Sequence, residues 1–198
     1  MNNNRKPKNR ALTRDYLLRA TYSYLQRFAT TEKNLRDVLA CKVRRRLPEA
    51  DPETETETDN GELYARAQEW IDDIVQKAVQ QNIVNDRQFA TSRAKSLIRS
   101  GNSRMKIAQK LRARGVTADL VTEVMEDLSE QYEDMDFLAA VKYVRKRRFG
   151  AFSTRHDGRE IVEKELASLC RAGFSYGLGN RILKMPREEL EEMLYDRD

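Results

Sequence analysis

The sequence predicts an all-α protein, and three observations support that prediction. The 198 residues include only 8 Gly and 4 Pro, so few helix breakers interrupt the chain. Hydrophobic residues recur at the spacing of a helical face nearly everywhere, and no run of β-branched residues alternates with period two. The apolar pattern also restarts several times, which indicates many short helices. A chain of this length suffices for one domain or a few small helical units.

The first helices are expected within residues 12–84. Thr31 suits an N-cap, and Glu32 directly after it suits the first turn of a helix. The apolar positions expected on three successive helices are Leu17, Ala20, Tyr24 and Phe28, then Leu35, Val38 and Leu39, then Trp70, Ile71, Ile74, Val75 and Ala78. Residues 47–62 interrupt this first three-helix unit with seven acids and no base. Such a composition buries little apolar area and predicts a disordered surface insertion, or alternatively a decoy for a basic surface.

The pattern then repeats in a second unit, residues 85–133, and a third, residues 134–185. The segments Ile107–Val116 and Glu165–Phe174 each place a Leu four residues before a Gly and an apolar residue directly after it. Gly suits the left-handed position that ends a helix, because it has no Cβ to clash there. The first unit has a degraded copy, with Val43 where the Gly would stand. This self-similarity indicates stacked three-helix repeats.

The two ends of the chain are expected to differ from the repeats. Residues 1–11 are predicted to be a disordered basic segment, and residues 186–198 an acidic tail or a short helix begun by Pro186.

Several functional classes are excluded by the composition. The longest uncharged run is nine residues, Ala172–Asn180, far short of a membrane helix, and no signal peptide is apparent. Cys41 and Cys170 are far apart and lack metal-type neighbours, so neither a disulfide nor a metal site is expected. The single histidine, His156, lies in a polar stretch and is interpreted as a surface loop residue. With no phosphate-binding glycine loop or nucleophile motif, we expect a cytoplasmic protein with no catalytic residues and no cofactor.

The charge of the chain is distributed in stripes. Five segments carry net charges of +10 (residues 1–47), −7 (48–62), +8 (85–117), −8 (118–140) and +6 (141–159), and the remaining residues bring the total to +5. Basic residues recur at corresponding places in the three units, so stacked units would present a continuous basic surface. Such a surface attracts nucleic acid or an acidic protein.

One segment superficially matches a helix-turn-helix, but its charge argues against sequence-specific DNA binding. A recognition helix must lie between rows of phosphates. The second helix here carries Asp119, Glu123, Glu126 and Asp127, with no Lys or Arg. We therefore interpret Ile107–Met125 as a packing motif.

An ordered set of motifs across the chain resembles the RecX family of bacterial regulatory proteins. The most specific part is Val84-Asn-Asp-Arg-Gln-Phe-Ala90, followed by Arg99-Ser-Gly101, Ile107, Leu111 and Arg114-Gly-Val116. Arg171-Ala-Gly-Phe-Ser-Tyr176 with Ile182-Leu183 is similar to the C-terminal repeat of that family, and Leu12–Leu39 to its opening helix pair. The resemblance covers about Leu12–Leu183. The acidic insertion and Val43 depart from the family pattern.

The resemblance implies three tandem three-helix units in an elongated, curved array. It also implies a non-enzymatic modulator of the RecA recombinase that lies in the groove of the RecA–DNA filament. Such a protein restrains filament growth, strand exchange and ATP hydrolysis, and thereby moderates recombination and the SOS response. The alternatives are a general helical nucleic-acid-binding protein and a scaffold that binds a basic partner through the acidic stripes.

The candidate contacts to RecA or to DNA phosphate are ten basic residues. They are Arg99, Arg104, Lys106, Lys110, Arg112, Arg114, Arg145, Lys146, Arg147 and Arg148. Some of them are expected to be ordinary helix-surface charges, contributing about 0–1 kcal/mol to stability. A tandem array buries its core internally, so a monomer is expected. Predicted core residues are Trp70, Phe89, Leu97, Leu111 and Leu169, with stacking on nucleic-acid bases as the alternative role for Trp70.

Overall fold

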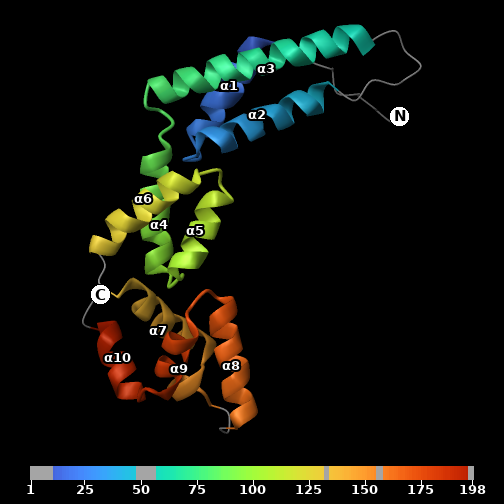
Figure 1. The fold of residues 1–198 in the computed structure, drawn as a ribbon. Helices are drawn as coiled ribbons and strands as arrows, with labels where there is room; N and C mark the ends of the chain where they lie inside the picture. The colour runs from blue at the N-terminus through green and yellow to red at the C-terminus, as the bar shows by residue number, and fades with distance from the viewer. Residues whose placement is uncertain (1–10, 48–56, 132–133, 155–157, 196–198) are drawn as a thin grey trace, which may run out of the picture. The chain divides into compact units, whose positions relative to one another are not determined.

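The protein is helical throughout the part of the chain that the structure describes. This computed structural model describes residues 11–47, 57–131, 134–154 and 158–195. Within those ranges it has ten α-helices, one short 3₁₀ helix and no strand, which confirms the all-α prediction (Figure 1). The helices are α1 (Arg14–Leu25), α2 (Glu32–Arg46), α3 (Glu57–Gln80), α4 (Asp86–Arg99), α5 (Arg104–Arg112), α6 (Ala118–Gln131), α7 (Met135–Arg147), η1 (Gly150–Phe152), α8 (Arg159–Arg171), α9 (Tyr176–Lys184) and α10 (Arg187–Tyr195).

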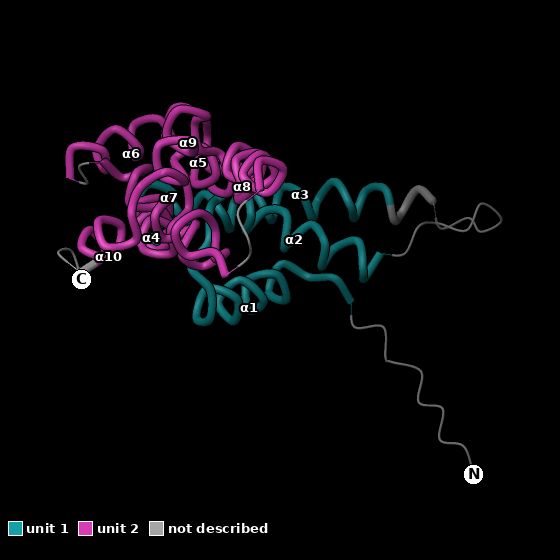
Figure 2. The backbone as a smooth tube through the Cα atoms, turned by 90° about the horizontal axis from the view of Figure 1, so that it is seen from below, with its two compact units in different colours: residues 1–89 teal, residues 90–198 magenta. Residues whose placement is uncertain are grey.

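The chain divides into two compact units between Phe89 and Ala90 (Figure 2). The boundary falls inside α4, so this helix begins in the first compact unit and continues into the second. The finer division into three units, with boundaries at 84/85 and 133/134, stays a prediction. No helix in the described ranges is both long enough and apolar enough to cross a membrane.

The first compact unit is built by α1, α2 and α3, which pack on one another. Thr13 and Thr31 cap α1 and α2, each accepting a hydrogen bond from the backbone N–H three residues later. Both caps satisfy a donor that the start of a helix leaves unpaired. The fully buried side chains of this core are Leu17, Leu35, Leu39, Val43 and Val75.

Two predictions for this unit need correction. Phe28 was expected on the apolar face of the first helix, but α1 ends at Leu25 and Phe28 is 51% exposed, stacked obliquely on Tyr24. Trp70 and Phe89 are only half-buried, although Trp70 packs against the core as expected.

The predicted acidic insertion is shorter than residues 47–62. α2 runs to Arg46, with Leu47 as its C-cap, and α3 already begins at Glu57, so Glu57–Glu62 are helical. Acidic residues are favourable near a helix N-terminus, because they oppose the positive end of the helix dipole. Residues 48–56, the predicted disordered segment 1–11 except Ala11, and His156 lie outside the described residues.

In the second compact unit, α5 packs against α6, and the α5–α6 turn follows the predicted glycine geometry. Gly115 has a φ of +88° and Gly173, in the α8–α9 turn, a φ of +94°. Leu111 and Leu169, each four residues before one of these glycines, are fully buried, as predicted. Leu97 is also buried.

The last helices share one core. α9 packs against α7 and α8, and α10 packs against α7. Leu169, Ile182 and Leu190 are fully buried there, and Leu194 nearly so. Of the two predicted forms of residues 186–198, an acidic tail or a short helix, the structure therefore has the helix, which contributes two leucines to the core.

Gly173 is expected to be intolerant of a side chain. A β-carbon at this position would lie 2.5 Å from Ser103 Oγ and 2.8 Å from Met105 Cε, on a backbone that already has positive φ. Gly173→Ala should lower the free energy of unfolding by about 1–3 kcal/mol, measured by urea denaturation followed by circular dichroism. Gly177→Ala is the matched control, because a β-carbon there meets nothing within 4 Å. Because Gly177 lies in the first turn of α9, the alanine should raise stability by up to about 1 kcal/mol. Equal urea midpoints for the two variants would contradict this account.

Candidate partner-binding surface

The ten predicted basic residues lie on α4, α5, the turn after α5, and α7 with its C-cap. Eight of them are exposed, whereas Lys106 and Lys110 are half-buried. All ten belong to the second compact unit, so their arrangement can be described within one body. The described residues include no group of three or more His, Cys, Asp or Glu side chains placed to hold a metal ion.

Most of these cations are not neutralised by the protein itself. Within the described residues, the side chains of Arg99, Arg104, Arg112, Arg145, Lys146 and Arg148 make neither an ion pair nor a hydrogen bond. Some cations elsewhere form ion pairs within the protein. Arg14 pairs with Asp73, and Arg36 pairs with Glu32 and Asp72. In α8 and α10, Arg159, Lys164 and Arg187 pair with an acid one turn away. Six of the ten candidate cations, on α4, α5, α7 and the C-cap of α7, are therefore left without a partner in the described residues.

The turn between α4 and α5 gathers part of this charge. Gly101 has a φ of +71°, and a β-carbon on it would lie 3.0 Å from Lys142 Cβ, so the turn rests directly on α7. Lys110 Nζ donates to Asn102 Oδ1 at 2.6 Å, which holds the amine at the same turn. Arg99 ends α4 two residues before Gly101. Arg99, Lys110 and Lys142 thus surround one turn, which we call the α4–α5 junction.

Lys142 was missed by the sequence reasoning. A signal was present, because Lys142 stands one helical turn before Arg145 and Lys146 on the same helix. What the sequence did not show is that the α4–α5 turn packs on that part of α7.

The six candidate residues between Arg99 and Arg114 do not form a single patch. Lys106 and Lys110 lie one turn apart on the flank that faces Asn102, with Lys106 Nζ donating to Gln109 Oε1. Arg112 lies about 160° around the helix from Lys110, at a rotation of about 100° per residue. Arg112 and Arg114 also lie at the opposite end of α5 from the junction. The predicted set is therefore split into a junction group and a group at the end of α5.

The four consecutive basic residues at the end of α7 have different roles. The Arg147 guanidinium lies 5.7 Å from the ring centroid of Tyr143 and 6.0 Å from that of Phe149, so it covers aromatic surface. Arg148 takes the left-handed conformation (φ +57°) that ends the helix. Arg145 and Lys146 are exposed without such contacts and are the better candidates for a partner.

Two aspartates join the start of one helix to the start of another in the same way. Asp136, on the first turn of α7, accepts the backbone N–H of Arg104 at 2.7 Å, and Asp86, the first residue of α4, accepts that of Glu32 at 2.8 Å. In both cases the donor is an N–H that the first turn of a helix leaves unpaired. Burial raises the pKa of Asp86 above its usual 3.8, although the hydrogen bond from Glu32 acts in the opposite direction.

Comparison with known proteins decides the family. Residues 85–125 match the sequence profile of the second three-helix domain of RecX. The regulatory protein RecX of Myxococcus xanthus is 36% identical over 175 residues, which cover 88% of this chain and 87% of that protein. This chain belongs to the RecX family. The regulatory protein RecX of Agrobacterium fabrum is 29% identical over 87% of the chain and 84% of its own length.

Solved RecX structures share the fold. The crystal structure of RecX from Lactobacillus salivarius superposes with a TM-score of 0.60 at 18% identity, covering 90% of this chain and 97% of that one. A second crystal structure of a regulatory protein RecX gives a TM-score of 0.60 at 19% identity, over 87% and 72% of the two chains. The resemblance read from the ordered motifs is therefore confirmed, and with it a three-helix repeat at residues 85–125. RecX is a family of regulatory proteins rather than of enzymes.

Within this RecX protein, α6 carries the acidic surface that the sequence indicated. Asp119, Glu123, Glu126 and Asp127 are all exposed. The apolar side chains Val121, Val124, Met125 and Leu128 form the opposite, buried face. An exposed row of carboxylates would repel DNA phosphates, so poor sequence-specific DNA recognition by α6 stays the prediction.

Asp86 is expected to make stability depend on pH. Its folded-state pKa is raised, so between about pH 3.8 and that raised value the folded protein binds more protons than the unfolded chain. The contribution of Asp86 to stability therefore falls as pH rises through this window. Asp86→Asn removes this titration and keeps an oxygen that can accept the Glu32 N–H. The unfolding free energy of the variant should rise relative to wild type between about pH 4 and pH 7, measured by urea denaturation. A constant difference across that range would contradict the assignment.

Proposed function

We propose that this protein binds the RecA–DNA filament and restrains RecA recombinase activity, thereby modulating homologous recombination and the SOS response. The observation that carries the proposal is the 36% identity to a regulatory protein RecX over 88% of the chain. The proposal places the protein in the cytoplasm, beside bacterial DNA, and treats it as a monomer.

The charge distribution supports this proposal. A nucleoprotein filament presents DNA phosphates together with acidic side chains, and both attract uncompensated cations. Six of the ten candidate cations, on α4, α5, α7 and the C-cap of α7, make no ion pair or hydrogen bond in the described residues. Cations that stabilise the fold internally would be paired instead, as Arg14 and Arg36 are. We assign filament contacts to Arg99, Lys110, Lys142, Arg145 and Lys146 around the α4–α5 junction, and to Arg112 at the end of α5.

Reversing three of these charges should abolish most of the inhibition. Arg99, Arg112 and Arg145 are exposed, and their side chains make no ion pair or hydrogen bond within the described residues, so Arg99→Glu, Arg112→Glu and Arg145→Glu together should leave the fold intact. The concentration that half-inhibits DNA-dependent ATP hydrolysis by RecA should rise at least about tenfold, or about 1.4 kcal/mol. Strand exchange and filament length should respond in parallel.

A matched triple variant provides the control. Arg19, Arg66 and Lys184 are also exposed and lie outside the proposed surface, so reversing all three changes the net charge equally. This control should inhibit almost as well as the unmodified protein. If both triple variants lose inhibition equally, net charge rather than the proposed surface is responsible.

The salt dependence of binding separates DNA contacts from protein contacts, and it also tests the alternative of a general nucleic-acid-binding protein. Each phosphate contact that is lost should reduce the slope of log K against log salt by about 0.9 on duplex DNA. The alternative predicts equal binding to naked DNA and to filaments, and inhibition of unrelated nucleic-acid enzymes. Stronger sedimentation with RecA filaments than with naked DNA is the outcome that the proposal requires.

A further inference from the structure

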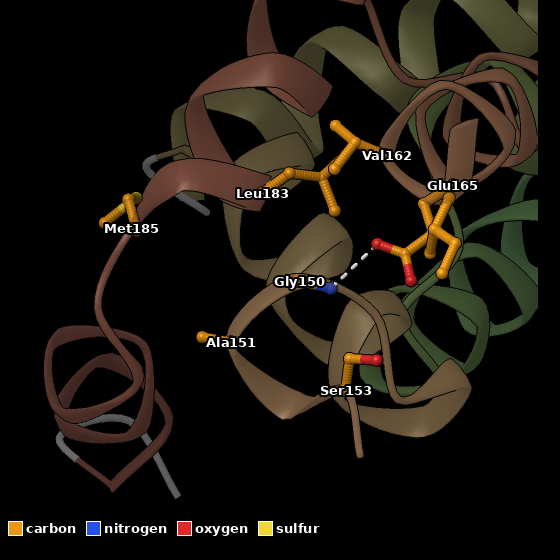
Figure 3. Close-up of a pocket in the computed structure, with 8 residues that line it drawn as sticks. Gly150, Ala151, Ser153, Val162, Glu165, Leu183 and Met185 are labelled. Carbon is orange, nitrogen blue, oxygen red and sulfur yellow. Dashed lines mark hydrogen bonds between the residues drawn. The ribbon is translucent and has the colours of Figure 1, made fainter. Parts of the chain in front are cut away.

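A pocket of about 300 Å³ lies beside the 3₁₀ turn η1, between α8 and the end of α9. Its walls are mainly apolar and include Ala151, Ile161, Val162, Leu183 and Met185. Val162 is exposed, so this wall reaches the protein surface. The polar side chains of the lining are Ser153 and Glu165, and Figure 3 shows the Glu165 carboxylate turned toward Gly150 at the pocket wall. The volume is at the lower limit for ligand pockets and suits one long side chain.

Glu165 occupies a position that the repeat pattern reserves for an apolar residue. In the segment that matches Ile107–Val116, Glu165 stands where Ile107 stands, four residues before the buried leucine. Leu35 has the same spacing from Leu39 in α2. Leu35 and Ile107 are 0% exposed, and Glu165 is only 7% exposed. Burying a carboxylate is costly unless it is paired, so a third apolar residue would make the more stable repeat.

The structure compensates this carboxylate only in part. Glu165 Oε2 accepts the backbone N–H of Gly150 at 2.9 Å, which ties α8 to η1. Within the described residues no cation pairs with Glu165, and its other oxygen makes no hydrogen bond. Lys164 pairs with Glu160, and Arg187 pairs with Glu191 and covers the Phe152 ring. Lys184, between the lining residues Leu183 and Met185, is exposed and makes no ion pair with Glu165. Glu165 therefore presents to the mainly apolar pocket a carboxylate oxygen that has no protein partner and keeps some contact with solvent.

We propose that this pocket receives a lysine or arginine side chain of a partner protein. The aliphatic stem would lie against Ile161, Val162 and Leu183, and the cationic head would reach the carboxylate of Glu165. Basic side chains combine an apolar stem with a charged tip, as such a lining requires. The identity of the partner as RecA rests on the proposed function, whereas the pocket and its cation do not. The site is thus an acidic counterpart to the basic surface on α4, α5 and α7.

A titration of the protein alone tests the pocket. Nα-acetyl-lysine methylamide and Nα-acetyl-arginine methylamide are added to ¹⁵N-labelled protein, and the amide signals of Gly150 and Ala151 are followed. At least one of these probes should shift the two signals saturably. The uncharged Nα-acetyl-norleucine methylamide should bind with a dissociation constant at least tenfold higher. Glu165→Gln keeps an oxygen for the Gly150 N–H but removes the charge, and it should abolish the preference for the cationic probes. Absence of that preference in the wild-type protein would overturn the inference.

A second experiment asks whether the pocket contacts the RecA filament. Glu165→Gln should weaken sedimentation with filaments at least tenfold and leave the melting temperature unchanged or higher, because the amide oxygen keeps the hydrogen bond from Gly150. Glu163→Gln, on the exposed side of α8, is the control and should bind as the wild type does. If the wild-type protein does not bind filaments at all, the proposed function fails and the titration alone decides the pocket. If Glu165→Gln lowers the melting temperature and filament binding is unchanged, Glu165 is a structural residue and the inference is overturned.

Discussion

The start of α5 and the α8–α9 turn pack together through a contact that excludes any side chain at Gly173. The Ser103 hydroxyl donates to the carbonyl oxygen of Ala172 at 2.7 Å, and α5 is capped because the N–H of Lys106 donates to Ser103 Oγ. A β-carbon on Gly173 would lie 2.5 Å from that oxygen. One serine thus begins a helix and fixes it to a turn 69 residues further along the chain. The short helices depend on such contacts, because nine residues are too few for a helix to be stable alone in water.

The position of the basic side chains follows from the same packing. Gly101 rests on Lys142, and Asp136 accepts the N–H of Arg104, so the α4–α5 turn is attached to α7 by two further contacts. Those contacts bring the charges of three helices close together. Like charges repel, so a stable protein would normally place carboxylates among them, as this one does around Arg14 and Arg36. Their absence from the side chains of Arg99, Arg145 and Lys146, within the described residues, is what an acidic partner would compensate.

Glu165 shows how a repeat can be altered at one position without loss of the fold. Leu169, Phe174 and Ile182 keep the apolar core of the last helices closed around it. The connection between α7 and α8 is longer than the one between α4 and α5, and it contains η1. The N–H of Gly150 in η1 donates to one oxygen of the carboxylate. The departure from the apolar pattern is therefore tolerated locally, and it coincides with the pocket beside η1.

The sequence alone determined the all-helical fold, the glycine turns and the family. Those properties depend on local preferences: the spacing of apolar residues, the left-handed conformation at Gly115 and Gly173, and an ordered series of short motifs. The sequence also identified most of the basic residues, because charge is a property of composition. Only the tertiary structure showed that Lys142 joins Arg99 and Lys110 at one turn, that Arg112 lies away from them, and that α10 contributes Leu190 and Leu194 to a core. These facts depend on contacts between residues far apart in the chain, for which helical periodicity carries no signal. For the same reason, the sequence showed Glu165 as part of a repeated segment but did not show that its carboxylate lines a pocket.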